Sequence, residues 1–99
     1  MEAQKQLGGL WYFSKNVSLS ALFQSIKSLV EADSKYLSVF IRLGSTNEYA
    51  VEFSYDLEGI DDIETAQRVY VEHTNAELKN IFKNNLIGYN IAAPLYKVK

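Results

Sequence analysis

Apolar and polar residues alternate along two neighbouring stretches of the chain, 35–43 and 48–56. Such a period of two is typical of a β-strand with one buried face and one face in water. The residues between the stretches, "GSTN", are common in turns. The two stretches are therefore predicted to form an antiparallel hairpin. The registers that bring both apolar faces together include Leu43 opposite Tyr49 and Ile41 opposite Tyr49.

A helical period replaces this alternation in the stretch 18–33. Apolar residues recur there every three or four positions, as on one face of an amphipathic helix. Ser18 is a good N-cap, because its side chain can accept a hydrogen bond from an early backbone N–H. The apolar stripe consists of Leu19, Leu22, Phe23, Ile26, Leu29 and Val30. It is predicted to pack on the sheet.

Two further strands are expected near the ends of the chain. The run "LWYF" at 10–13 is apolar at every position, which predicts a strand buried on both faces. The pair Gly8-Gly9 before it is interpreted as a hinge. Alternation returns in 87–98, and Pro94 has no N–H to give to a neighbouring strand. This last strand is therefore expected at an edge of the sheet.

The stretch 61–86 is ambiguous between helix and strand. A capping-box-like start at Asp61 and an apolar stripe ending at His73 favour a helix. A single continuous helix would put Glu77 on the buried stripe, so the interpretation is two helices separated by a kink near residues 74–75. The alternative is an extra strand at 67–73 followed by a short helix, because "RVYVEH" is rich in β-formers.

The predicted order of elements is β-α-β-β-α-β in one domain, 1–99. This order indicates the α+β class and a ferredoxin-like sandwich. In that fold a four-stranded antiparallel sheet carries two helices on one face, with the first and third strands central and the others at the edges. The opposite face of the sheet is left open.

Composition excludes several kinds of chemistry. The chain has no Cys and a single His, His73, so a zinc site built on these residues is excluded. Phosphate-binding glycine motifs and a nucleophile elbow are missing from the sequence. We therefore expect no enzyme, no catalytic residue, no metal and no cofactor, and interpret His73 as a half-buried structural residue. The start of the chain lacks a signal-peptide pattern, which predicts a cytoplasmic protein outside the membrane.

Acidic residues gather in the region 48–64. Between Arg42 and Arg68 the chain has seven acids and no base. The spacing does not match a calcium-binding EF-hand loop, so the acids are interpreted as a turn, a helix cap and a docking charge. Acids on the predicted third strand would repel phosphate, which makes a nucleic-acid partner unlikely.

The open face of the predicted sheet combines aromatic side chains with single charges, as protein interfaces do. We therefore expect a small non-catalytic binding protein (an inhibitor, immunity-type or adaptor protein) that acts through this face and the acidic region 48–64. The expected partner is another protein, including a second copy of the chain. The alternative is a ligand-sensing regulatory domain that forms a homodimer. The predicted partner-binding residues are Trp11, Tyr36, Phe40, Arg42, Glu52, Asp56 and Glu58.

Overall fold

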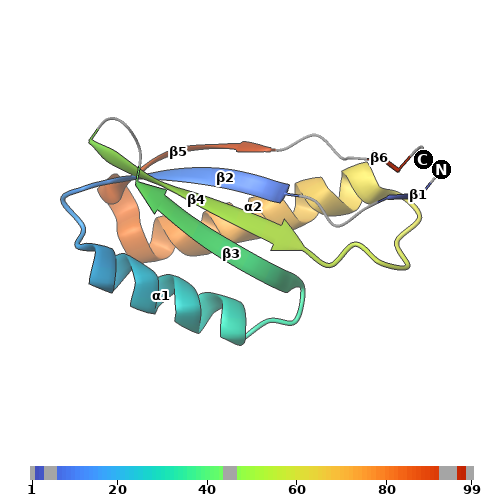
Figure 1. Cartoon of the computed structure of the whole chain (residues 1–99), viewed down its shortest axis with the longest axis horizontal. Coiled ribbons are helices and arrows are strands. Elements are labelled where there is room, and N and C mark those ends of the chain that lie inside the picture. The colour runs from blue at the N-terminus through green and yellow to red at the C-terminus, as the bar shows by residue number, and fades with distance from the viewer. Residues whose placement is uncertain (1, 4–6, 44–46, 92–95, 98–99) are drawn as a thin grey trace.

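The computed structural model describes residues 2–3, 7–43, 47–91 and 96–97. Its main elements are β2 (Leu7–Ser14), α1 (Leu19–Glu31), β3 (Tyr36–Leu43), β4 (Glu48–Tyr55), α2 (Ile63–Phe82) and β5 (Leu86–Ile91) (Figure 1). A short 3₁₀ helix, η1 (Lys83–Asn85), joins α2 to β5. The protein belongs to the α+β class, as predicted. The sequence did not predict the separate pair of two-residue strands, β1 (Glu2–Ala3) and β6 (Tyr96–Lys97).

The four long strands form one antiparallel sheet in the order β3-β4-β2-β5. β2 and β4 are central, whereas β3 and β5 form the edges. Of the registers that the alternation allows, the hairpin takes the one with Leu43 opposite Tyr49. The last long strand lies at an edge, as expected, but Pro94 lies outside the described residues.

The core lies between the sheet and the two helices, on one face of the sheet. Alternate residues of the central strands point into it, and Trp11, Phe13 and Phe53 have no exposed surface. Trp11 packs edge-to-face on Phe53 with their ring centroids 5.1 Å apart. Leu22 of α1 and Leu78 of α2 join the same cluster, while α1 lies beside β3 and α2 contacts β2 and β5 (Figure 1). Full burial of a phenylalanine side chain stabilises a fold by roughly 1.5–3 kcal/mol.

The other face of the central strand β2 is only half-covered. Leu10 and Tyr12 are half-buried, so the prediction of a strand buried on both faces holds for one face alone. Gly8 and Gly9 belong to this strand and do not form a hinge before it. A β-carbon on Gly8 would collide with the ring of Tyr55, so this position has room only for glycine.

α2 is one uninterrupted helix of 20 residues, so both the predicted kink and the alternative strand at 67–73 are wrong. Asp62 caps its start by accepting a hydrogen bond from the Thr65 N–H. The buried residues of α2 are Gln67, Val71, Thr74, Leu78 and Phe82. This stripe is turned by about one residue from the predicted one, so Glu77 lies at its margin and His73 is exposed, contrary to the prediction.

A β-bulge interrupts β3 near its start. Tyr36 pairs with Tyr55 and Ser38 pairs with Ser54, which leaves Leu37 as the extra residue. An extra residue reverses the direction of every side chain before it. Tyr36 therefore points into the core, where it is only 8% exposed, and not to the open face as predicted. Leu37 is exposed instead.

Candidate functional site: an apolar groove between α1 and β3

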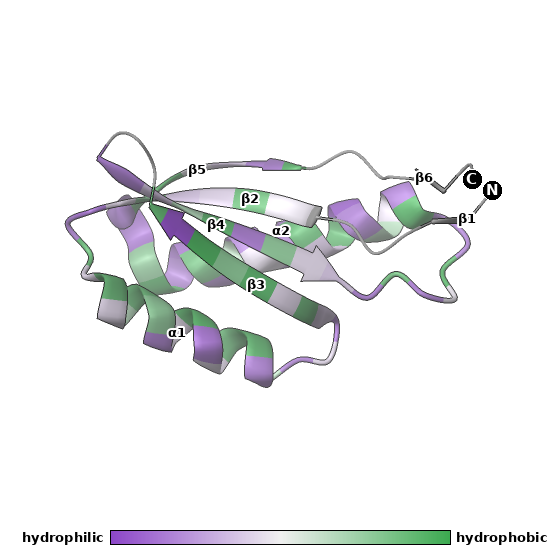
Figure 2. Cartoon of the chain, viewed as in Figure 1, coloured by the Kyte–Doolittle hydropathy of each residue, from purple (hydrophilic) through white to green (hydrophobic). Residues whose placement is uncertain are grey.

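An apolar groove of about 840 Å³ runs between α1 and the edge strand β3. Its apolar walls are formed by Leu19, Phe23, Ile26, Val30, Val39 and Ile41, and Phe40 and Lys27 also border it. Hydrophobic residues, green in Figure 2, recur along both α1 and β3. The groove is the largest departure from the sandwich expected from the sequence, in which the stripe of α1 closes onto the sheet.

The groove is open because α1 covers β3 incompletely. Leu22 and Ile26 are buried, but Leu19 in the first turn and Phe23 at one margin of the stripe are 46% and 52% exposed. Successive residues of a helix differ by about 100° in direction, so Phe23 cannot face the core together with Leu22 when only one edge strand lies beneath. The prediction that the whole stripe packs on the sheet is therefore wrong for Leu19 and Phe23.

Large apolar side chains continue from the groove around the edge of β3. Phe40 and Leu43 are both 65% exposed. Phe40 lies directly opposite Glu52 of β4, on the open face of the sheet where the sequence predicted it. We call the groove together with Leu19, Phe23, Phe40 and Leu43 the α1–β3 surface.

The charged groups near this surface are few. Arg42 and Glu52 form an ion pair within the chain, between β3 and β4. The guanidinium group is mostly in water, so solvent screening keeps this pair weak. Lys27, on α1, is the one charged side chain among the residues that border the groove. The α1–β3 surface is therefore mainly apolar.

Trp11 does not belong to any surface, although the sequence placed it among the partner-binding residues. It is fully buried, and its indole N–H donates to the Asn75 side-chain oxygen at 3.2 Å. Tyr89 of β5 stacks on its ring at 5.6 Å between centroids. Because the run 10–13 is apolar at every position, the sequence did not show which of its residues face the core. Trp11 lies opposite the buried Val51 of β4 and therefore faces the core with it.

The acidic residues do not form one surface. Glu48 begins β4, whereas Asp56 follows its other end, about 25 Å away for an eight-residue strand. Asp56 and Glu58 are exposed in a turn, where the Glu58 N–H donates to the Asp56 carboxylate at 3.1 Å. Hydrogen bonds from the Thr65 hydroxyl and backbone N–H lower the pKa of Asp62 at the start of α2. In the part of the chain that the structure describes, no three acidic or histidine side chains gather as metal ligands would.

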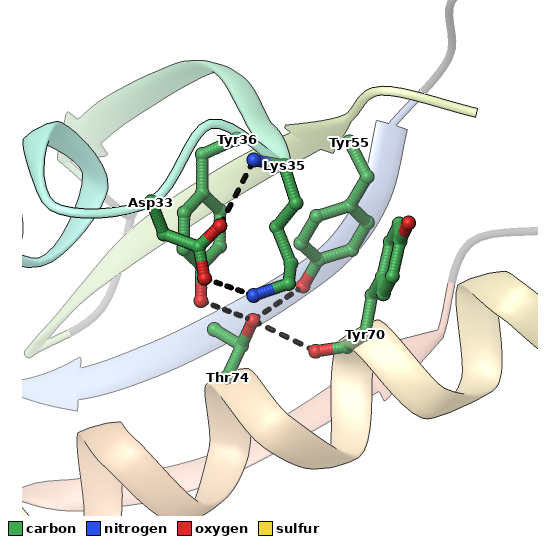
Figure 3. Close-up of polar contacts among 6 residues, drawn as sticks. All are labelled: Asp33, Lys35, Tyr36, Tyr55, Tyr70 and Thr74. Atoms are coloured by element: carbon green, nitrogen blue, oxygen red, sulfur yellow. Dashed lines mark hydrogen bonds and ion pairs between the residues drawn. The ribbon is translucent and has the colours of Figure 1, made fainter. Parts of the chain in front are cut away.

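A buried polar network joins the first residue of β3, Tyr36, and the last residue of β4, Tyr55, to α2 (Figure 3). The Tyr55 hydroxyl donates to the Thr74 hydroxyl at 2.9 Å, and the Tyr36 hydroxyl lies 2.8 Å from the same oxygen. Thr74 in turn donates to the backbone carbonyl of Tyr70 at 2.9 Å. A threonine hydroxyl has one proton and two lone pairs. Its proton goes to Tyr70, so Tyr36 must act as a donor and the Thr74 hydroxyl is fully used.

This saturation marks the network as structural. Burial raises the pKa of Tyr55 and, less strongly, that of Tyr36. A catalytic acid or base needs a pKa near the working pH, and these shifts lead away from neutrality. Lys35 covers the network from outside, since it pairs with Asp33 and lies 5.5 Å from the Tyr36 ring centroid.

The raised pKa values predict a loss of stability in alkali. Both tyrosines stay protonated in the folded protein at a pH where they ionise in the unfolded chain. Their contribution is therefore complete below about pH 10, the ordinary tyrosine pKa, and is lost as the pH rises further. Melting temperatures measured from pH 8 upward should fall steeply above about pH 10. The Tyr55→Phe variant should show a smaller alkaline fall, and an equal fall would contradict this origin.

No family model matches the chain, and no curated protein or solved structure is detectably similar to it. Among the described residues, no helix is both long enough and apolar enough to cross a membrane. The function must therefore be argued from the α1–β3 surface itself.

Proposed function

We propose that the protein is a small non-catalytic protein-binding protein that acts through the α1–β3 surface. One observation carries this proposal: Leu19, Phe23 and Phe40 expose between 46% and 65% of their surface around one apolar groove, and Leu43, at the end of the same strand β3, is 65% exposed. Single exposed apolar residues are ordinary on proteins, but a contiguous group of them marks an interaction site.

The chemistry of the surface supports a protein partner. Aromatic residues are enriched at the centres of protein interfaces, and charged residues are depleted there. Phe23 and Phe40 supply the aromatic anchors, and the charges of Arg42 and Glu52 are paired with each other at its rim. Asp56 and Glu58 lie beyond the end of β4 and are proposed as secondary docking charge. Inhibitor, immunity-type and adaptor roles stay predictions, as does a cytoplasmic location.

We further propose that the architecture is ferredoxin-like. The four long strands and two helices follow the order strand, helix, strand, strand, helix, strand, and the first and third of these strands are central. Both observations support the proposal. The β1–β6 pair stands outside that pattern.

A ligand-sensing regulatory domain is the second candidate, and the size of the groove favours it. A volume of about 840 Å³ lies within the usual range of small-molecule sites, roughly 300–1,000 Å³. Apolar walls with Lys27 at the border would suit an apolar ligand that ends in an anionic group. Native mass spectrometry of the protein purified from its own host would reveal such a ligand as a fixed added mass.

The proposal is tested by affinity capture with the Phe23→Ser and Phe40→Ser variants. Each should weaken association at least tenfold, as truncation of a central aromatic anchor does. Neither should change the melting temperature by more than a few degrees, because both side chains are largely exposed. Ile87→Ser is a matched control, since Ile87 is 56% exposed on β5 at the opposite edge of the sheet. Equal capture by all three variants would refute binding through the α1–β3 surface.

A further inference from the structure

We infer that the α1–β3 surface binds a second copy of the same chain, by antiparallel pairing of the two β3 strands across a two-fold axis. The two four-stranded sheets then join into one continuous sheet of eight strands. This inference rests on the proposed function and names its partner.

The edge of β3 is the first reason. Among the described residues, no segment pairs with the outer side of β3. Proteins usually protect such an edge with lysine, proline, a bulge or a short strand, because it is a template for another strand. β3 contains no Lys and no Pro, and its bulge lies near its start, so the sequence of Ser38–Leu43 does little to protect the edge. α1 lies on this side of β3, and the groove separates part of the helix from the strand. Arg42, its single charge, is already paired with Glu52.

β3 is also complementary to itself. A two-fold axis perpendicular to the sheet places the helix-covered faces of both copies on the same side of the joined sheet. Residues that lie opposite each other across the axis must then both be odd-numbered or both be even-numbered, so that their side chains share a face. With the axis at Phe40, the two Phe40 side chains meet on the open face and Val39 meets Ile41 on the helix side. Ser38 then lies opposite Arg42, so no two like charges face each other. The strand thus matches its own copy in both polarity and shape.

The groove gives the third reason. Each groove borders its own β3 edge, so the two-fold axis brings the two grooves side by side. Leu19 and Phe23 of each copy can then cover Val39 and Ile41 of the other. A stable interface buries about 800 Å² on each partner. Phe23 and Phe40 alone expose roughly 200 Å² per copy, given that a buried aromatic side chain hides 150–250 Å², and Leu19, Leu43 and the strand backbone add to this.

The chain contains no cysteine, so introduced cysteines report this pairing without interference. Directly opposed residues of antiparallel strands have Cα atoms about 4.5–5.5 Å apart, within the range that a disulfide spans. Ser38→Cys chains mixed with Arg42→Cys chains should therefore form a cross-linked dimer under mild oxidation. Neither chain alone should do so efficiently, because position 38 is not opposite 38 and 42 is not opposite 42. Asn90→Cys, exposed on β5, is the control for the other edge.

Sedimentation velocity of the unmodified chain accompanies the cross-linking. A dimer that Phe23→Ser dissociates at least tenfold more readily, together with cross-linking specific to the 38/42 mixture, supports the inference. A monomer at every concentration overturns it, as does a dimer that cross-links through Asn90→Cys or without preference for the mixture. If the chain is monomeric while Phe23→Ser and Phe40→Ser still lose a captured protein, only the self-association is wrong. If capture is unaffected as well, the proposed function also fails.

Discussion

Phe53→Ser is expected to unfold the protein under conditions in which the unmodified chain is stable. Phe53 has no exposed surface and contacts the rings of Trp11 and Tyr36, with centroids 5.1 Å and 5.7 Å away. Truncating a buried phenylalanine costs about 3–5 kcal/mol, and serine adds a buried hydroxyl. A domain of this size is stabilised by only about 5–15 kcal/mol in total. Urea unfolding followed by circular dichroism measures the loss.

Phe40→Ser is the matched control, because the same substitution is made at an exposed phenylalanine on the neighbouring strand. Phe40 is 65% exposed in the single chain, so at a protein concentration low enough to keep the chain monomeric its loss should lower the free energy of unfolding by less than about 1 kcal/mol. If Phe40→Ser were as damaging as Phe53→Ser, Phe40 would be covered within the chain. The α1–β3 surface would then not be available to any partner.

Features that depend on neighbouring residues could be predicted from the sequence. The hairpin of β3 and β4 has the predicted parity, because only one parity brings both apolar faces together. Ser18 caps α1 as expected, since its hydroxyl accepts the Ala21 N–H at 3.1 Å. The exposure of Phe40 follows from the same alternation that buries Phe53. These are local patterns, and the physics behind them acts within a few residues.

The remaining features depend on contacts between distant segments. The buried stripe of α2 includes the polar residues Gln67 and Thr74, which a pattern of apolar residues does not include. Their hydrogen-bond partners, Gly8 and Tyr55, lie far away along the chain, so the sequence does not show that these polar groups are satisfied. The bulge at Leu37 moved Tyr36 into the core, where Thr74 satisfies its hydroxyl. Hydrophobic periodicity treats polar residues as exposed, so it misses polar groups that are buried in pairs.

The groove could have been foreseen from two predictions taken together. The stripe of α1 is wide, with six apolar residues, and the strand that follows it was expected at an edge of the sheet. An edge strand offers a helix less surface than a central strand does. Part of the stripe then lies outside the core: Phe23 at its margin and Leu19 in the first turn of the helix. Neither the width of the stripe nor the edge position of the strand is enough to expose Phe23, and the groove follows only from both together.

Thr74→Val should destabilise the protein nearly as much as a truncation of the core, although it preserves the shape of the side chain. Valine removes the oxygen that accepts hydrogen bonds from Tyr36 and Tyr55. Each buried hydroxyl left without a partner costs roughly 1–3 kcal/mol. Thr74→Ser is the matched control: it keeps the oxygen and loses one methyl group, so the expected loss is about 1 kcal/mol.

A double-mutant cycle separates the hydrogen bonds from packing in this network. In the Thr74→Val background the Tyr55 hydroxyl has lost its acceptor, so Tyr55→Phe removes an unsatisfied group and should restore part of the stability. In the unmodified protein the same Tyr55→Phe substitution breaks a good hydrogen bond and should lower stability. The two effects of one substitution therefore have opposite signs, which is the signature of direct coupling. Additive losses in the free energy of unfolding would mean that Thr74 stabilises the protein by packing alone.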